Sequence, residues 1–95
     1  MKVNWTAAAQ TQLRDIHSFI ARSSPQYAKK IVDRLTRRSQ QIATFPRSGR
    51  VVPEANDVNI REVVEGPYRI IYHLIDDEVD IIAVVHSARP WPESP

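Results

Sequence analysis

The chain has 95 residues with no cysteine and two glycines, and 42% of its residues are hydrophobic while 25% are charged. This length and composition suit one globular domain over residues 1–95 and exclude a disulfide framework, a cysteine zinc site and a low-complexity chain. The sequence shows neither a secretory leader pattern nor an apolar run of about 18 residues, so we expect a soluble cytoplasmic protein.

The net charge of +2 hides an uneven distribution along the chain. Residues 1–50 carry ten Lys and Arg against two acidic residues, whereas residues 51–95 carry three Arg against nine Asp and Glu. The basic half predicts a face for an anionic partner, either nucleic acid or an acidic protein segment. Helix surfaces that meet only solvent would give the same pattern.

The N-terminal half is predicted to form a short strand and a helix. Residues 1–5 suit a strand, and Thr6 suits the N-cap of the helix that follows. The apolar residues of this helix are spaced by four, three and four positions, which places them on one face. They are Ala9, Leu13, Ile16 and Ile20.

A second helix is predicted from Pro25 to Phe45, because Ser24 suits an N-cap and proline suits a first helical turn. The connection between the two helices is short, so they should lie antiparallel as a hairpin. The apolar stripe of the second helix contains Ala28, Ile31, Leu35, Ile42 and Phe45, and its remaining surface carries Lys29, Lys30, Arg34, Arg37 and Arg38.

After the loop that begins with "FPRSGR" at residues 45–50, the apolar pattern alternates. Residues 58–65, 68–75 and 79–86 are predicted strands, joined by Gly66-Pro67 in a type II′ turn and by residues 76–78. The middle strand carries apolar side chains on both faces, so we expect both faces to be covered. The fold class is α+β, in the order β-α-α-β-β-β: an N-terminal strand and an antiparallel two-helix hairpin packed on a small antiparallel sheet. The position of the first strand in the sheet stays open.

This arrangement resembles the ParE/RelE superfamily of bacterial toxins from type II toxin–antitoxin systems, and it is closer to the ParE, or plasmid stabilisation, branch. The resemblance runs from Trp5 to Arg89. The similar segments are "AAAQTQLRDIHSFI", "SPQYAKKIVDRL", "FPRSGR", Arg61 in "NIREVV", "YRIIYHLIDDEVDIIAVVH" and the closing Arg89.

The resemblance implies a growth-inhibiting toxin that a cognate antitoxin neutralises by folding a disordered segment across it. In well-studied ParE members the target is DNA gyrase, whereas RelE members cleave mRNA on the ribosome. We expect a ParE-like gyrase inhibitor without a cofactor or metal. The alternatives are a RelE-type endonuclease and a degenerate member that retains only antitoxin binding. Fold alone does not separate these activities.

The sequence supplies candidate groups for the nuclease alternative. RNA cleavage without a metal needs an acid or base and cations around the phosphate. His86 could supply the first and Arg61, Arg69 and Arg89 the second. All lysines precede the predicted sheet and no tyrosine follows Arg89, which departs from the RelE pattern.

Each of these residues also has a purely structural interpretation. His86 could be a strand-end histidine bonded to backbone, and on simple alternation it would share a face with Val84, Ile82 and Asp80. Arg50 could either anchor its own loop to an acidic neighbour or meet a partner. The candidate partner-binding residues are Arg50, Arg61, Arg89 and Trp91, the last of which is expected on an exposed tail between two prolines.

Overall fold

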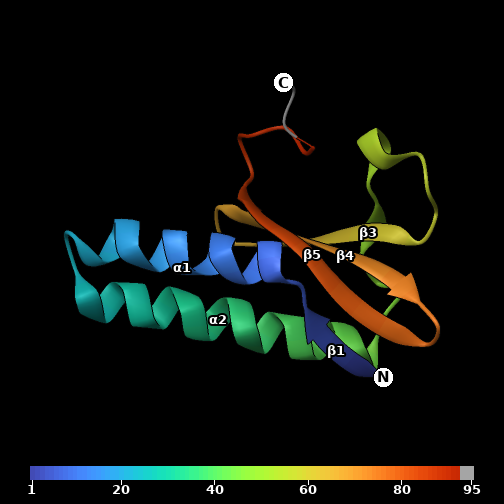
Figure 1. Cartoon of the computed structure of the whole chain (residues 1–95), viewed down its shortest axis with the longest axis horizontal. Helices are drawn as coiled ribbons and strands as arrows, with labels where there is room; N and C mark the ends of the chain where they lie inside the picture. Colours follow the sequence, from blue (N-terminus) through green and yellow to red (C-terminus); the bar gives the residue numbers. More distant parts are fainter. Residues whose placement is uncertain (93–95) are drawn as a thin grey trace.

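Two antiparallel helices lie together against one face of a five-stranded sheet in the computed structural model, which describes residues 1–92 (Figure 1). The predicted α+β class is confirmed. The elements in chain order are β1 (Lys2–Trp5), α1 (Ala7–Ala21), α2 (Pro25–Thr44), β2 (Arg50–Val51), the 3-10 turn η1 (Pro53–Ala55), β3 (Ile60–Glu65), β4 (Tyr68–Ile75) and β5 (Glu78–His86).

The strand order in the sheet is β1-β5-β4-β3-β2. The β2, β3, β4 and β5 strands form the expected antiparallel part, and β1 pairs parallel to β5, which makes the sheet mixed. The two-residue strand β2 lies within the segment predicted as loop. It is too short to produce a recognisable alternation, and it pairs with β3 only through Arg50 and Val51.

Side chains at the predicted caps start both helices. Thr6 Oγ1 accepts a hydrogen bond from Ala9 N at 3.2 Å, and Ser24 Oγ accepts one from Tyr27 N at 3.1 Å. The prediction for Phe45 was wrong, because the helix ends at Thr44 and Phe45 adopts a non-helical backbone at φ −130°. Its side chain therefore leaves the apolar stripe and is 67% exposed.

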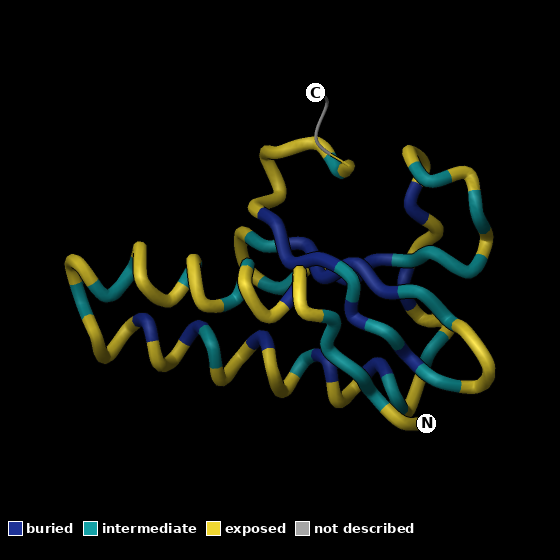
Figure 2. Tube along the Cα trace, in the orientation of Figure 1, coloured by how far each residue is buried: buried dark blue, intermediate teal, exposed yellow. Residues whose placement is uncertain are grey.

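The core lies on both faces of the sheet, as the two-sided pattern of β4 predicts. Buried side chains from the helices meet one face, and a smaller cluster lies on the other face under the η1 segment and the C-terminal tail (Figures 1 and 2). The first cluster comprises Ala9, Ile31, Leu35, Ile42, Val63, Ile70, Tyr72, Val79, Ile81 and Val84, and the second Val52, Ile71, Ala83 and Val85.

A β-bulge changes the alternation predicted for β5. Ile71 pairs with Ala83 and Tyr72 pairs with Ile81, so Ile82 is the extra residue. Ile82 consequently packs on the second cluster, whereas Val84 belongs to the first. Asp80 lies between Val79 and Ile81 of the first cluster and so faces the other way, and the prediction that Val84, Ile82 and Asp80 share a face with His86 was wrong at Ile82 and Asp80.

Two-residue turns join the three long strands. Glu65 pairs with Tyr68, and Gly66 between them has φ +56°, as the type II′ turn requires before proline. Asp76 and Asp77 both adopt positive φ, at 51° and 59°, which is the type I′ pattern. Glu78 is therefore the first residue of β5 and not part of the turn.

Tyr72 ties the loop after α2 to the core. Its side chain is buried, and its hydroxyl donates to Pro46 O at 2.7 Å and accepts from Gly49 N at 3.1 Å. Burial raises the pKa of Tyr72, so the phenol stays protonated and can fill both roles. The loop that carries Arg47 and leads into β2 at Arg50 is thereby fixed in position.

Replacing Tyr72 with phenylalanine should lower the free energy of unfolding by about 1–3 kcal/mol, because the Pro46 carbonyl and the Gly49 N–H lose their partner inside the protein. Urea denaturation followed by circular dichroism measures the change. The matched control is Tyr27→Phe, since Tyr27 is 50% exposed and its hydroxyl can be solvated. Equal stability of the two variants would contradict the anchoring role of Tyr72.

Candidate protein-binding groove and polar network

A groove of about 780 Å³ lies between α1 and the end of β5. Most of its lining is apolar or aromatic, and Phe19 in α1 is 70% exposed. An exposed aromatic side chain beside a concave surface is typical of a binding site for another molecule. The lining residues are Gln12, Asp15, Ile16, Phe19, Tyr68, Val84, Val85, His86, Ala88 and Arg89.

The groove runs along a part of β5 that β1 does not cover. Pairing between β1 and β5 ends at Ile81, although β5 continues to His86. Gln12 reaches this edge from α1, and its Oε1 accepts a hydrogen bond from Val84 N at 2.8 Å. A side chain thus takes the place of a neighbouring strand, and an extended peptide could pair there after displacing it.

His86 lies in this groove with one ring nitrogen engaged. Its Nδ1 accepts a hydrogen bond from Ala88 N at 3.1 Å, and its ring meets Tyr68 edge-to-face with centroids 5.8 Å apart. A neutral imidazole that accepts at Nδ1 carries its proton on Nε2. Burial, together with the nearby Tyr27, raises the pKa of Tyr68, which therefore stays a neutral phenol beside this ring.

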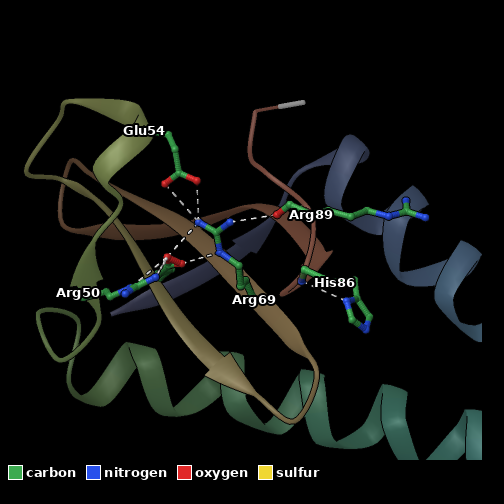
Figure 3. A network of polar contacts seen from close by, with 7 residues as sticks. Arg50, Glu54, Arg69, His86 and Arg89 are labelled. Carbon is green, nitrogen blue, oxygen red and sulfur yellow. Dashed lines mark hydrogen bonds and ion pairs between the residues drawn. The ribbon is translucent and has the colours of Figure 1, made fainter. Parts of the chain in front are cut away.

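On the other face of the sheet, Arg69 and Glu62 form a buried ion pair (Figure 3). Arg69 Nε donates to Glu62 Oε2 at 2.7 Å and Nη2 donates to Oε1 at 3.0 Å. The Glu62 side chain is 0% exposed and that of Arg69 is 8% exposed. This bidentate hydrogen bonding raises the pKa of Arg69, so the guanidinium remains charged inside the protein.

Two further side chains surround this pair. Arg50 donates to Glu62 Oε1 through Nε at 3.2 Å and Nη2 at 3.1 Å, and Glu54 accepts from Arg69 Nη2 at 3.3 Å. The Glu54 backbone N–H, the Arg69 guanidinium and the backbone N–H of Trp91 together hold the pKa of Glu54 below its ordinary value. The structure thus places Arg50 against an acidic neighbour, one of the two alternatives that the sequence left open.

The C-terminal tail is fixed to the same network. Arg69 Nη1 donates to the Arg89 carbonyl at 3.3 Å, and Trp91 packs against the second apolar cluster. Trp91 is partly buried, not on an exposed tail as expected, because residues of β5, η1 and β3 lie beneath it. Residues 93–95 of the predicted tail lie outside the described chain.

The structure does not bring the four candidate nuclease residues together. Arg69 follows Tyr68, the cross-strand partner of His86, so Arg69 and His86 lie on opposite faces of the sheet. In Figure 3 the His86 ring and the Arg89 side chain extend away from the Arg69 guanidinium. Only His86 and Arg89 line the same groove.

Arg61 lies far along the sheet from His86. It pairs with Tyr72, whereas His86 pairs with Tyr68, a separation of four residues or about 13 Å along the strand direction. Its guanidinium donates to three carbonyl oxygens, those of Val58 at 3.1 Å, Arg47 at 3.3 Å and Gly49 at 2.9 Å. Arg61 therefore holds the loop before β2.

Comparison with known proteins identifies the family. Residues 3–91 match the family described as ParE toxin of type II toxin-antitoxin system, parDE. The chain belongs to the ParE toxin family. Among its relatives, Y4kP of Sinorhizobium fredii is 31% identical over 97% of this chain and 94% of that protein, and toxin RelE2 of Caulobacter vibrioides is 34% identical over 93% and 97%.

A solved structure has the same fold as this ParE-family chain. It comes from the chromosomal ParDE toxin–antitoxin system of P. aeruginosa and superposes with a TM-score of 0.76, covering 90% of this chain and 95% of the other at 18% identity. The α+β arrangement expected from the resemblance is therefore shared with a chain of that ParDE system.

Two observations on this ParE-family chain concern what residues 1–92 do not contain. No group of three or more His, Asp and Glu side chains in this range is placed to hold a metal ion. No helix in this range combines the length and apolar character needed to cross a membrane.

Sequence reasoning missed Glu62, Glu54, Gln12 and Phe19. A signal for Glu62 was present, because simple alternation places it on the same face as Ile60 and Val64. An acidic side chain inside such a strand needs a cationic partner. For Gln12 and Phe19 no local signal exists, since their role depends on the distance between α1 and β5.

Proposed function

We propose that this ParE-family toxin inhibits growth by binding DNA gyrase in the cytoplasm, without chemistry of its own, and that an antitoxin neutralises it. The observation that carries the proposal is the separation of His86 from two of its three candidate cations, Arg61 and Arg69. Arg69 is committed to Glu62, and Arg61 is committed to three backbone carbonyls. A nuclease would need such cations around one phosphate beside its acid or base.

The groove supports binding of a protein segment. Its lining is largely apolar and aromatic, its rim carries the exposed Phe19, and one side is a strand edge covered by a single glutamine. We assign the antitoxin to this groove, with an initially disordered segment that folds there as a helix or added strand. Arg89 lines the groove and would contact it, whereas Arg50, Arg61 and Trp91 lie outside it and stay candidate contacts for the target.

The test is a supercoiling reaction with purified DNA gyrase, relaxed plasmid and the antitoxin-free toxin. We expect loss of supercoiling or trapped cleaved DNA. The variant His86→Gln should inhibit as strongly as the original chain, because His86 contributes no chemistry in this mechanism. Unimpaired supercoiling in the presence of folded toxin would refute the proposal.

A second candidate is mRNA cleavage on the ribosome, favoured by the presence of His86 and Arg89 in one groove. In this case His86→Gln should lower the rate of cleavage by more than about 100-fold, the usual contribution of a general acid or base. Primer extension on mRNA from translating ribosomes detects the cut sites. Cleavage that persists in His86→Gln would exclude this role for the histidine.

A further inference from the structure

The Arg69 guanidinium binds two carboxylates that differ in distance and exposure. It donates to the fully buried Glu62 at 2.7 and 3.0 Å. It donates to Glu54 at 3.3 and 3.4 Å, and the Glu54 side chain is 38% exposed. Figure 3 shows the Glu54 carboxylate reaching the guanidinium from the η1 segment. The longer distances make Glu54 the outer and weaker of the two ligands.

Without Glu54, the network would carry a net positive charge. Arg50 and Arg69 both donate to Glu62, so two guanidinium groups share one carboxylate, and their charges sum to +1. Glu54 supplies the remaining negative charge. The Arg69 side chain is almost fully buried, and an uncompensated charge there would be costly. The position of the Glu54 carboxylate is therefore a site for one negative charge.

Three donors converge on this position. The backbone N–H of Glu54, the Arg69 guanidinium and the backbone N–H of Trp91 all stabilise the ionised carboxylate. Two of them are held by contacts that do not involve Glu54, because Arg69 is bonded to Glu62 and Trp91 packs against the second apolar cluster. The donors therefore form a preformed site for an oxyanion.

Glu54 can leave this site without a change in the backbone. The η1 segment is anchored on both sides of Glu54, since Val52 is buried and Ala55 packs against the second apolar cluster. The glutamate between them is exposed. Rotation of its side chain into solvent is enough to free the Arg69 guanidinium on that side, and the backbone N–H of Glu54 stays where it is.

The surroundings of the site favour a protein carboxylate. Val64 pairs with Arg69 across the sheet, so its side chain lies on the same face, and it is 56% exposed. This valine suits an apolar side chain of a protein, since protein interfaces combine apolar contact with hydrogen bonds. A nucleic acid carries a charge at every nucleotide, and the displaced Glu54 carboxylate would repel it.

We propose that this position is a docking site for an acidic side chain of a partner protein. The partner's carboxylate replaces Glu54 on Arg69, and a neighbouring apolar side chain of the partner covers Val64. One carboxylate balances the charge of +1 that Arg50, Arg69 and Glu62 leave when Glu54 turns away. Glu54 is thus an internal competitor that occupies the site until the partner binds.

The experiment is an NMR titration of the whole ¹⁵N-labelled chain with the peptide N-acetyl-leucyl-glutamyl-leucinamide. The signals to follow are the Arg69 Nε–H and the Trp91 backbone N–H, which belong to the site on both sides. We expect both signals to shift in a saturable way. The peptide with glutamine in place of glutamate should bind about tenfold or more weakly, because it lacks the charge-assisted hydrogen bonds.

Two variants separate competition at the site from net charge. Glu54→Gln should raise the affinity for the glutamate peptide about fivefold, the factor that an ion pair with a partly exposed carboxylate contributes. Asp77→Asn makes the same change in net charge at the β4–β5 turn, where asparagine tolerates the φ of 59°, and should leave the affinity unchanged. Adding Arg50→Gln to Glu54→Gln removes the net charge of +1 and should cancel the gain. All three positions are exposed, so circular dichroism should show folded variants.

Three results would overturn the proposal. The first is equal affinity for the glutamate and glutamine peptides, which would mean that no carboxylate is recognised. The second is an equal effect of Glu54→Gln and Asp77→Asn, which would leave Glu54 as a structural counter-ion only. The third is a shift of the same two signals by a short single-stranded RNA at lower concentration than by the glutamate peptide, which would assign the site to nucleic acid.

Discussion

Replacing Glu62 with glutamine is expected to lower the free energy of unfolding by about 3–5 kcal/mol. The carboxylate is fully buried and receives two hydrogen bonds from Arg69, whose side chain is itself only 8% exposed. Without that charge, the Arg69 guanidinium stays buried with the partly exposed Glu54 as its remaining carboxylate. A domain of this size has about 5–15 kcal/mol of stability in total, so the loss is a large fraction of it.

Equilibrium urea denaturation at neutral pH measures this effect. The informative control is the double variant Glu62→Leu, Arg69→Met, which replaces the whole pair with apolar side chains of similar size and should lie close to the original stability. Arg50→Gln should change stability by about 1 kcal/mol or less, because Arg50 is 69% exposed. A double variant less stable than Glu62→Gln would show that the pair itself contributes net stability.

The helices and long strands could be predicted because each produces a local pattern. Thr6 and Ser24 are capping side chains at the positions where α1 and α2 begin. The helical pattern of apolar residues continues over more than two turns in both helices. Gly66 and the paired aspartates mark the two turns between long strands. The residues that specify these helices, strands and turns therefore lie close together in the sequence, where their pattern can be recognised.

The features that escaped prediction depend on residues far apart in the chain. The β1 strand pairs parallel to β5, with Lys2 opposite Glu78, and no local sequence pattern predicts a pairing between residues so far apart in the chain. The extra residue Ile82 reverses the alternation of β5, and a bulge has no fixed sequence signature here. The separation of Arg69 from His86 follows from strand register, which a one-residue shift would invert.

The same dependence explains why the candidate site was only partly predicted. His86 and Arg89 do line the groove, but its other wall comes from α1, about seventy positions earlier in the sequence. One hydrogen bond of 2.8 Å, from Val84 N to Gln12 Oε1, joins the two walls. The second wall becomes visible only when the helix hairpin is placed against the sheet.

Replacing Gly49 with alanine should destabilise the protein by about 2–4 kcal/mol. A β-carbon at this position would overlap the Tyr72 hydroxyl and lie 2.6 Å from the Glu62 carbonyl oxygen, so either the loop or β3 must move. Overpacking of this kind costs about 1–3 kcal/mol, and a disturbed hydrogen bond from Gly49 N to Tyr72 adds about 1 kcal/mol. Thermal or urea denaturation measures the change.

Gly66 provides a matched control because it requires glycine for a different reason. A β-carbon there meets no atom within 4 Å, but its φ of +56° is unfavourable for alanine, so Gly66→Ala should cost about 1–2 kcal/mol. Asparagine tolerates this conformation better than alanine and should recover part of that loss at Gly66. At Gly49 asparagine should be at least as harmful as alanine, because there the obstacle is the neighbouring Tyr72 and Glu62 atoms. Recovery by asparagine at Gly49 would mean that backbone conformation, rather than close contact with Tyr72, makes glycine necessary in this loop.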